Sequence, residues 1–338
     1  LTSVRTLTDE FEQNAAAQID VLWVVDNSES MSEEQTALGE NFSSFITNLS
    51  ESKVDFHIGV VSTDTSDQGI LHTGSSNVAW IDSSTPDRDA TFLENVQVGT
   101  SGSRIERSFE STALALGVPL TYKPGDQKTP PNIGFLREKA SLFIIMVSDE
   151  DDKSFGPVGY YNRLFESYWG AGNESRISVS AIIGLPTVDQ DTTSNDQGQN
   201  EPTNDSALVG GGCILEGRGS AAPGQRYFDL AEKSGGIATS ICGNFSEALR
   251  DLSVSAAGLK STFRLSQKAN PHGSVSPCGS IGSVNFCVKV DDTAIAVDDG
   301  NGAGLGWIYD ENQNAIVFGV NHIPPPTAAI TVEYMKVR

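Results

Sequence analysis

Apolar residues dominate four short runs in the first two thirds of the chain. These runs are Ile19 to Val25, Val54 to Ser62, Leu142 to Ser148 and Ile177 to Gly184. Runs with few polar positions are typical of strands buried on both faces, as in a parallel sheet that is covered by helices. The sequence therefore predicts an α/β fold.

Helical periodicity alternates with these runs. Ile105, Phe109, Ala113 and Leu116 follow one another at helical spacing and mark one face of a helix. The other expected elements are the helices Met31 to Leu49, Gln225 to Lys233 and Phe245 to Leu259, and the strand Gly236 to Ile241. This alternation predicts a doubly wound, mostly parallel sheet flanked by helices.

The pattern changes at Thr262, where short alternating runs separated by Gly, Asn, Asp and Pro turns begin. The expected strands are Val284 to Val290, Ala294 to Val297, Trp307 to Tyr309, Ala315 to Val320 and Ala329 to Tyr334. Many short strands with frequent turns are typical of a small antiparallel, sandwich-like β domain.

The domain organisation follows from this change. We expect an N-terminal extension (1–14), an α/β domain (15–259) and an antiparallel β domain (260–338). Two polar stretches of the α/β domain, 65–86 and 186–212, have little to bury and are predicted to be surface insertions, the first with a short strand Val78 to Ile81.

Charge narrows the range of partners. The 338 residues carry a net charge of −22, which disfavours nucleic acid and anionic membranes and is compatible with divalent cations. No apolar run is long enough to span a bilayer, so no transmembrane segment is expected. The sequence starts at Leu1 without a methionine or an apolar leader, and we expect that any signal peptide has been removed.

The four cysteines form two local pairs, Cys213 with Cys242 and Cys278 with Cys287. Neither pair has the spacing of a zinc site, so we expect two disulfides, with buried free thiols as the alternative. Disulfides imply an oxidising compartment, either extracellular, at the cell surface or periplasmic.

Oxygen-bearing side chains gather where the predicted strands end. Asp26, Ser28 and Ser30 occupy alternate positions directly after the first strand, and Asp149 follows the strand that ends at Ser148. Ligands of a parallel sheet bind outside the carboxyl ends of its strands, and such oxygens suit a hard divalent cation. Thr100 lies on a loop before a predicted helix, and the loop after the first strand is expected to be exposed.

This arrangement resembles the von Willebrand factor type A domain. Its metal-ion-dependent adhesion site combines a D-x-S-x-S motif, here Asp26, Ser28 and Ser30, with a threonine, here Thr100, and an aspartate, here Asp149. The resemblance covers residues 15–259. It implies that the hydroxyl groups bind Mg²⁺ or Mn²⁺ directly, that the aspartates act through water, and that an acidic group of a partner completes the metal sphere. Ca²⁺ accepts the same ligands.

Each of these residues also has a simpler interpretation. The Asp26 loop could only cap the following helix, and Asp151 and Asp152 are interpreted as a solvated turn. Asp64, which follows another strand, is interpreted as a turn residue. The run from Asp298 to Gly302 is interpreted as an ordinary turn rather than as a calcium loop.

The sequence thus predicts a secreted or surface adhesion protein without enzymatic activity. It would capture an acidic group of a protein or another surface ligand through a metal ion, as in a bacterial adhesin. One alternative is an assembly module with a purely structural metal. The other is a phosphatase of the haloacid dehalogenase type, which is disfavoured because Ser28 stands where a general-acid aspartate is needed.

Overall fold

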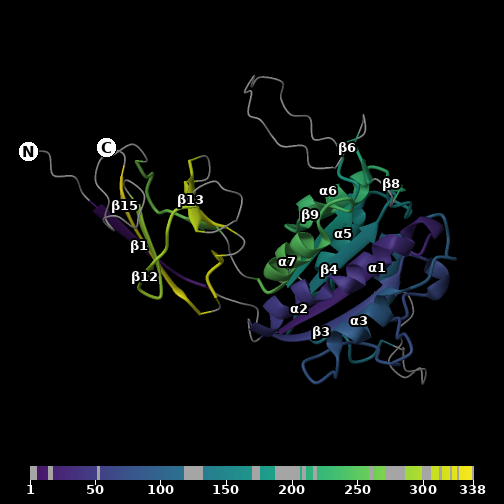
Figure 1. Cartoon of the computed structure of the whole chain (residues 1–338). Helices are drawn as coiled ribbons and strands as arrows, with labels where there is room; N and C mark the ends of the chain where they lie inside the picture. The colour runs from purple at the N-terminus through teal and green to yellow at the C-terminus, as the bar shows by residue number, and fades with distance from the viewer. Residues whose placement is uncertain are drawn as a thin grey trace, which may run out of the picture. The chain divides into compact units, whose positions relative to one another are not determined.

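The chain folds into two compact units in the computed structural model (Figure 1). One unit comprises residues 17–256, and the other combines residues 1–16 with 257–338. The structure describes residues 6–13, 18–51, 54–117, 132–169, 176–186, 206–207, 211–215, 219–258, 262–270, 286–298, 306–311, 314–319, 322–325 and 327–336. Within these residues, no helix is both long and apolar enough to cross a membrane.

A five-stranded parallel sheet forms the centre of the larger unit, in the order β3-β2-β4-β5-β9. Its strands are β2 (Gln18–Val25), β3 (Asp55–Ser62), β4 (Ser141–Ser148), β5 (Ile177–Ile183) and β9 (Ala238–Ser240). The chain adds strands on one side of β2 and then on the other, as doubly wound sheets do. The predicted fold class is confirmed.

Helices cover the sheet in two groups. The helices are α1 (Ser32–Glu40), α2 (Phe42–Glu51), α3 (Arg88–Val96), α4 (Ser108–Ala115), α5 (Val158–Glu166), α6 (Gln225–Ser234) and α7 (Phe245–Ala256), with short 3-10 turns η1 (Glu29–Met31), η2 (Thr65–Asp67) and η3 (Ser167–Trp169). The first group packs α1 against α3 and α2 against α3 and α7, whereas the second packs α5 against both α4 and α6.

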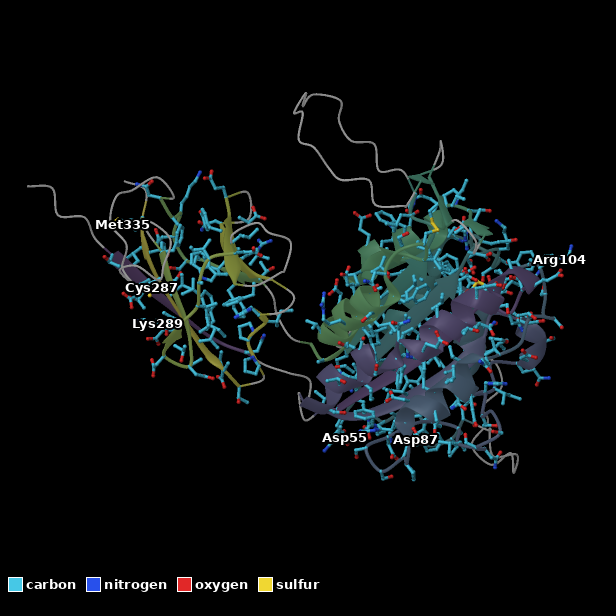
Figure 2. The ribbon with its side chains drawn as sticks, viewed as in Figure 1. Asp55, Asp87, Arg104, Cys287, Lys289 and Met335 are labelled. Atoms are coloured by element: carbon cyan, nitrogen blue, oxygen red, sulfur yellow. A yellow bond between two sulfur atoms is a disulfide. The ribbon has the colours of Figure 1, made fainter. Side chains whose placement is uncertain are left out.

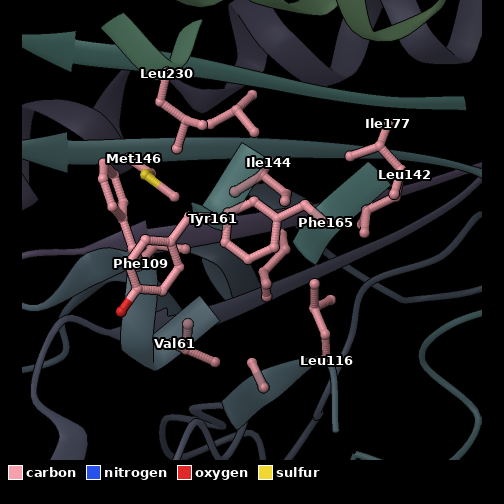
Figure 3. Packing of buried hydrophobic residues seen from close by; sticks show 14 of the residues in the cluster. Val61, Phe109, Leu116, Leu142, Ile144, Met146, Tyr161, Phe165, Ile177 and Leu230 are labelled. Atoms are coloured by element: carbon pink, nitrogen blue, oxygen red, sulfur yellow. The ribbon is translucent and has the colours of Figure 1, made fainter. Parts of the chain in front are cut away.

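Alternate residues of β2 point to opposite faces of the sheet, where each group of helices covers a hydrophobic core. Trp23 meets the rings of Phe45 and Phe92 edge-on, at centroid distances of 5.3 and 5.4 Å, under the first group of helices. On the opposite face, Phe109 of α4 packs 5.2 Å from Tyr161 of α5 (Figure 3). Burial on both faces explains why the strand sequences are so uniformly apolar.

The helices and strands of the larger unit differ from the prediction at several points. The helix expected from Met31 to Leu49 is divided at Asn41, whose side-chain amide donates to the Ala37 carbonyl oxygen at 2.8 Å and competes with helical bonding. Helix α3 was not predicted. The strand expected from Val78 to Ile81 is reduced to a single bridge between Ile81 and Ile58.

The smaller unit contains two antiparallel sheets, as predicted. One has the order β1-β15-β11-β12 and the other β10-β14-β13. Their strands are β1 (Thr6–Glu12), β10 (Thr262–Arg264), β11 (Phe286–Val290), β12 (Thr293–Ala294), β13 (Trp307–Asp310), β14 (Ala315–Phe318) and β15 (Ala329–Met335). Phe263 and Phe318 of one sheet share a buried cluster with Phe286 and Val332 of the other, so the sheets form a sandwich.

The N-terminal segment is part of this β unit rather than an extension. Strand β1 pairs with β15 along its whole length, from Thr6 opposite Met335 to Glu12 opposite Ala329. On the other edge of β15, Lys289 of β11, which Figure 2 labels, forms an ion pair with Glu333, with 2.8 Å between Nζ and Oε1. The chain therefore completes the β unit only after it has traversed the α/β unit.

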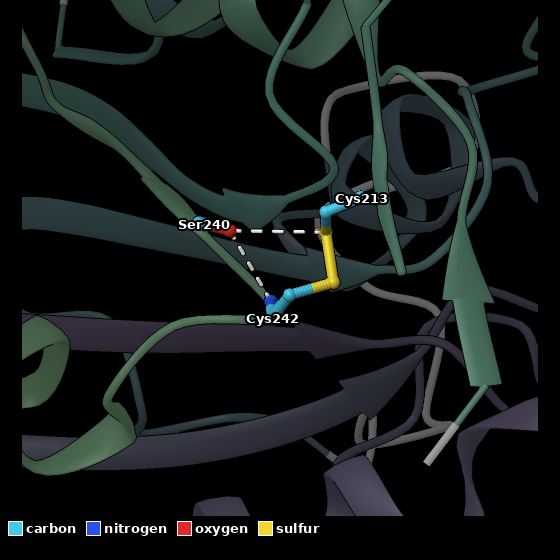
Figure 4. The surroundings of a disulfide bond; sticks show 3 residues. All are labelled: Cys213, Ser240 and Cys242. Carbon is cyan, nitrogen blue, oxygen red and sulfur yellow. Dashed lines mark hydrogen bonds between the residues drawn. A yellow bond between two sulfur atoms is a disulfide. The ribbon is translucent and has the colours of Figure 1, made fainter. Parts of the chain in front are cut away.

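A disulfide joins Cys213 to Cys242, as predicted (Figure 4). Cys213 begins β7 (Cys213–Leu215), which lies between β6 (Ser206–Ala207) and β8 (Gly219–Ala221) in a small antiparallel sheet. Cys287 is also disulfide-bonded, whereas Cys278, its predicted partner, lies outside the described residues.

Replacing both Cys213 and Cys242 with Ser should lower the free energy of unfolding by about 3 to 4 kcal/mol. The bond closes a loop across a sequence separation of 29 residues, and its loss frees the unfolded chain. Urea denaturation of the wild type and the double variant measures the difference. Equal midpoints and slopes would contradict the prediction.

Candidate metal centre

The candidate site lies at the carboxyl ends of β2 and β4, where the doubly wound order reverses direction. The Asp26 amide donates to the Val147 carbonyl oxygen at 3.0 Å, so the loops that follow these neighbouring strands begin side by side. Crevices at this position of a parallel sheet are the usual place for ligands. The topology thus explains how Asp26 and Asp149, distant in sequence, come together.

Asp26 is fully buried, so the expectation of an exposed loop is wrong for this residue. One carboxylate oxygen accepts the Ser28 amide at 2.7 Å, and the other accepts the Ser148 hydroxyl at 2.6 Å. Burial raises the pKa of Asp26, and the hydrogen bond from Ser148 is the largest opposing effect. Asp26 therefore fixes the geometry of both loops.

The two serines of the motif lie together beside Asp149. The hydroxyl oxygens of Ser28 and Ser30 are 3.1 Å apart. Burial raises the pKa of Asp149, and a hydrogen bond from Ser30 offsets part of the increase. Four of the five predicted ligands, Asp26, Ser28, Ser30 and Asp149, are thus connected by hydrogen bonds or electrostatic contacts.

A small pocket of about 40 Å³ opens next to this group. Ser30 and Asp149 line it together with Glu34, and its other wall consists of Gly219 to Ala221, Ile241 and Cys242. The Ala222 amide donates to the Asp149 carbonyl oxygen at 2.7 Å, which holds the end of the β8 hairpin against the site. The disulfide thus fastens one wall of the pocket.

The loop that carries Thr100 contacts the Asp26 loop. The Gln35 side-chain amide bridges the carbonyl oxygens of Asp26 and Gly99, at 2.8 Å from each. A Cβ atom on Gly102 would lie 2.0 Å from the Asn27 side-chain oxygen, so a larger residue would require the Asn27 side chain to move. Thr100 itself is half-buried, and its role as a metal ligand stays a prediction.

Glu106 and Ser148 were not predicted as part of the site. Glu106 is fully buried, and one of its carboxylate oxygens accepts a hydrogen bond from the Thr63 hydroxyl. Burial, followed by the negative charge of nearby Asp26, raises the pKa of Glu106 to about 8. The signal in the sequence that could have indicated Glu106 was its position directly after Ile105 and just before a predicted helix.

The other acidic residues that the sequence analysis singled out near the strand ends have structural roles. Asp64 caps η2 by accepting the Ser66 amide at 2.8 Å, in agreement with its interpretation as a turn residue. The interpretation of Asp151 and Asp152 as a solvated turn is wrong. Asp152 is buried and forms an ion pair with Arg226 at 3.1 Å, and Asp151 accepts the Arg226 amide.

The donors fit a hard cation. They combine carboxylate and hydroxyl oxygens, and Asp149 Oδ1 is buried without a hydrogen-bond partner among the described residues. Burying such an oxygen is costly unless something satisfies it. No group of three or more His, Cys, Asp or Glu side chains in the described ranges is arranged to hold a metal by itself, so the hydroxyl groups would be essential ligands.

No protein-family model and no curated protein matches the chain. Among solved structures, a von Willebrand factor type A protein from Catenulispora acidiphila has 10% identity and a TM-score of 0.39, with coverage of 99% of this chain and 66% of that one. The pilus adhesin SpaC from Lactobacillus rhamnosus GG has 8% identity and a TM-score of 0.42, with coverage of 97% and 40%. Proximal thread matrix protein 1 from the mussel byssus has 9% identity and a TM-score of 0.37, with coverage of 76% of this chain and 52% of that one. The chain thus spans 40% to 66% of these proteins.

Proposed function

We propose that the α/β unit is an adhesion module that captures an acidic group of a protein or surface partner through a divalent cation. Asp26, Ser28, Ser30 and Asp149 would hold Mg²⁺, Mn²⁺ or Ca²⁺, with Thr100 as a further ligand. The observation that carries the proposal is that Ser30 and Asp149 line the same pocket, where an incoming carboxylate would meet a cation held by these residues.

The chemistry of the donors supports this assignment. Hydroxyl ligands neutralise little of the charge of a cation, so the ion keeps a strong attraction for an additional anionic ligand. The chain itself carries a net charge of −22 and repels acidic partners in general. A bound cation would therefore make one point of the surface selectively attractive to a carboxylate.

A non-enzymatic role fits the surroundings of Asp26. A phosphatase nucleophile needs a carboxylate oxygen that can reach substrate. Both oxygens of Asp26 accept hydrogen bonds, and the side chain is fully buried. The disulfide at the pocket wall supports action in an oxidising compartment, and we propose a secreted or surface location.

Acetate is a suitable probe because the partner carboxylate is not identified. Acetate should displace water from Mn²⁺ bound to the full chain and lower the relaxation rate of water protons, whereas acetamide, of similar size and uncharged, should leave the rate unchanged. Ser30→Ala and Thr100→Ala should weaken Mn²⁺ binding because each removes a hydroxyl ligand.

The same titration separates capture from a purely structural metal. If Mn²⁺ binds and stabilises the chain but acetate has no more effect than acetamide, the cation serves only to hold the loops together. A chain that binds no Mn²⁺ would rule out both forms of the proposal.

A further inference from the structure

We propose that Glu106 is an additional acidic residue of the cation site and tunes the strength with which the bound ion attracts an acidic ligand. This inference rests on the proposed function. Glu106 is not part of the metal-site motif described above. It lies two residues before α4, on the same segment as Thr100.

The position of Glu106 is fixed from two directions. Its carboxylate accepts the hydroxyl of Thr63, the residue that follows β3, and its carbonyl oxygen accepts the Lys153 amide at 2.6 Å. Lys153 lies in the loop after β4. Glu106 is thus held between the loops after β3 and β4, and Asp26, at the end of the intervening strand β2, is its electrostatic neighbour.

The second carboxylate oxygen of Glu106 needs a partner. Oε1 is completely buried and accepts no hydrogen bond from the described residues. None of the ion pairs identified in the described part of the chain involves Glu106, Asp26 or Asp149. Two neighbouring buried carboxyl groups without a basic side chain are costly unless they share a proton, as the contact between Glu106 and Asp26 allows, or a divalent cation or its bound water takes the place of that proton.

A third carboxylate changes what the cation can do. An ionised Glu106 beside Asp26 would add negative charge close to the cation, which would strengthen metal binding and weaken the attraction for an incoming anion. The partner carboxylate would then be held moderately, and the affinity would depend on other contacts as well. Replacing Glu106 should therefore change metal affinity and ligand affinity in opposite directions.

Calorimetric titration of the full chain with Mn²⁺ tests the first half of this inference. Glu106→Gln keeps the size of the side chain and an acceptor for Thr63, and should weaken Mn²⁺ binding about tenfold or more. Its thermal stability in EDTA should equal or exceed that of the wild type, because a buried carboxyl group has been removed. Glu110→Gln, at a half-buried position of α4 that is paired with Arg107, is the matched control and should bind Mn²⁺ normally.

Acetate titration of the same Glu106→Gln variant, loaded with Mn²⁺, tests the second half, and acetate affinity should rise several-fold over the wild type. A solely structural role for Glu106 would instead lower stability in EDTA and leave Mn²⁺ affinity unchanged, which would overturn the inference. If Glu106→Gln does not fold, Glu106→Asp, which keeps the charge but shortens the reach, should show the loss of Mn²⁺ affinity.

The outcomes separate this inference from the proposed function. If the wild type binds Mn²⁺ and both Glu106→Gln and Glu106→Asp bind it with the same affinity as the wild type, only the role of Glu106 is rejected. Absence of Mn²⁺ binding by the wild type rejects the proposed function and this inference with it.

Discussion

Replacing Asp26 with Asn is expected to weaken Mg²⁺ binding by more than about a hundredfold. The substitution removes a buried negative charge at the centre of the site. The Asn side-chain oxygen can still accept the Ser28 amide, so the loop should keep its shape. Ala is a poorer choice, because it also leaves the Ser28 amide without its acceptor. Calorimetry in the absence of competing metals measures the affinity.

Asp64→Asn provides the control for this experiment. Asp64 also follows a strand at the carboxyl edge of the sheet, but its side chain caps η2 and accepts the Ser103 amide. The control should bind Mg²⁺ like the wild type. Undiminished Mg²⁺ affinity in the Asp26 variant would reject the site, whereas equal losses in both variants would point to a nonspecific effect of surface charge.

Trp23→Ala should lower the free energy of unfolding by about 3 to 5 kcal/mol. Trp23 is fully buried between the rings of Phe45 and Phe92, on the strand that leads to Asp26. Its indole nitrogen has no hydrogen-bond partner among the described residues, so the cost comes from lost packing. Urea denaturation measures the change.

Phe155→Ala is the matched aromatic control, since the Phe155 side chain is 70% exposed. Its main contact is with the Arg107 guanidinium, 4.6 Å from the ring centroid, and its loss should cost less than about 1 kcal/mol. Comparable losses in the Trp23 and Phe155 variants would contradict the packing described for the first core.

The strands of the α/β unit could be predicted from the sequence because burial on both faces leaves few polar positions. Helix α3 could not, because it follows a polar insertion and buries only part of its surface. The approach of the first helix to α3 depends on tertiary packing, which the sequence does not show. Gly39 lets α1 approach α3 so closely that a Cβ atom there would lie 2.3 Å from a methyl group of Leu93.

Part of the candidate site could be predicted because some of its residues are recognisable from local sequence alone. The spacing of Asp26, Ser28 and Ser30 is local, and Asp149 follows directly from the end of a strand. Glu106 and Ser148 contribute through contacts with residues distant in sequence, 43 positions for Glu106 with Thr63 and 122 for Ser148 with Asp26. Periodicity and spacing along the chain do not encode such contacts.

The pairing of β1 with β15 determines how the molecule would carry mechanical tension. Thr6 and Met335 lie opposite each other at the same end of the two antiparallel strands. A pull applied outward at these two residues would pass from β1 directly to β15 and bypass the α/β unit that lies between them in sequence. The hydrogen bonds lie across the strands, so such a pull would open them one after another from that end. The α/β unit would come under load only after the hydrogen bonds between β1 and β15 had broken.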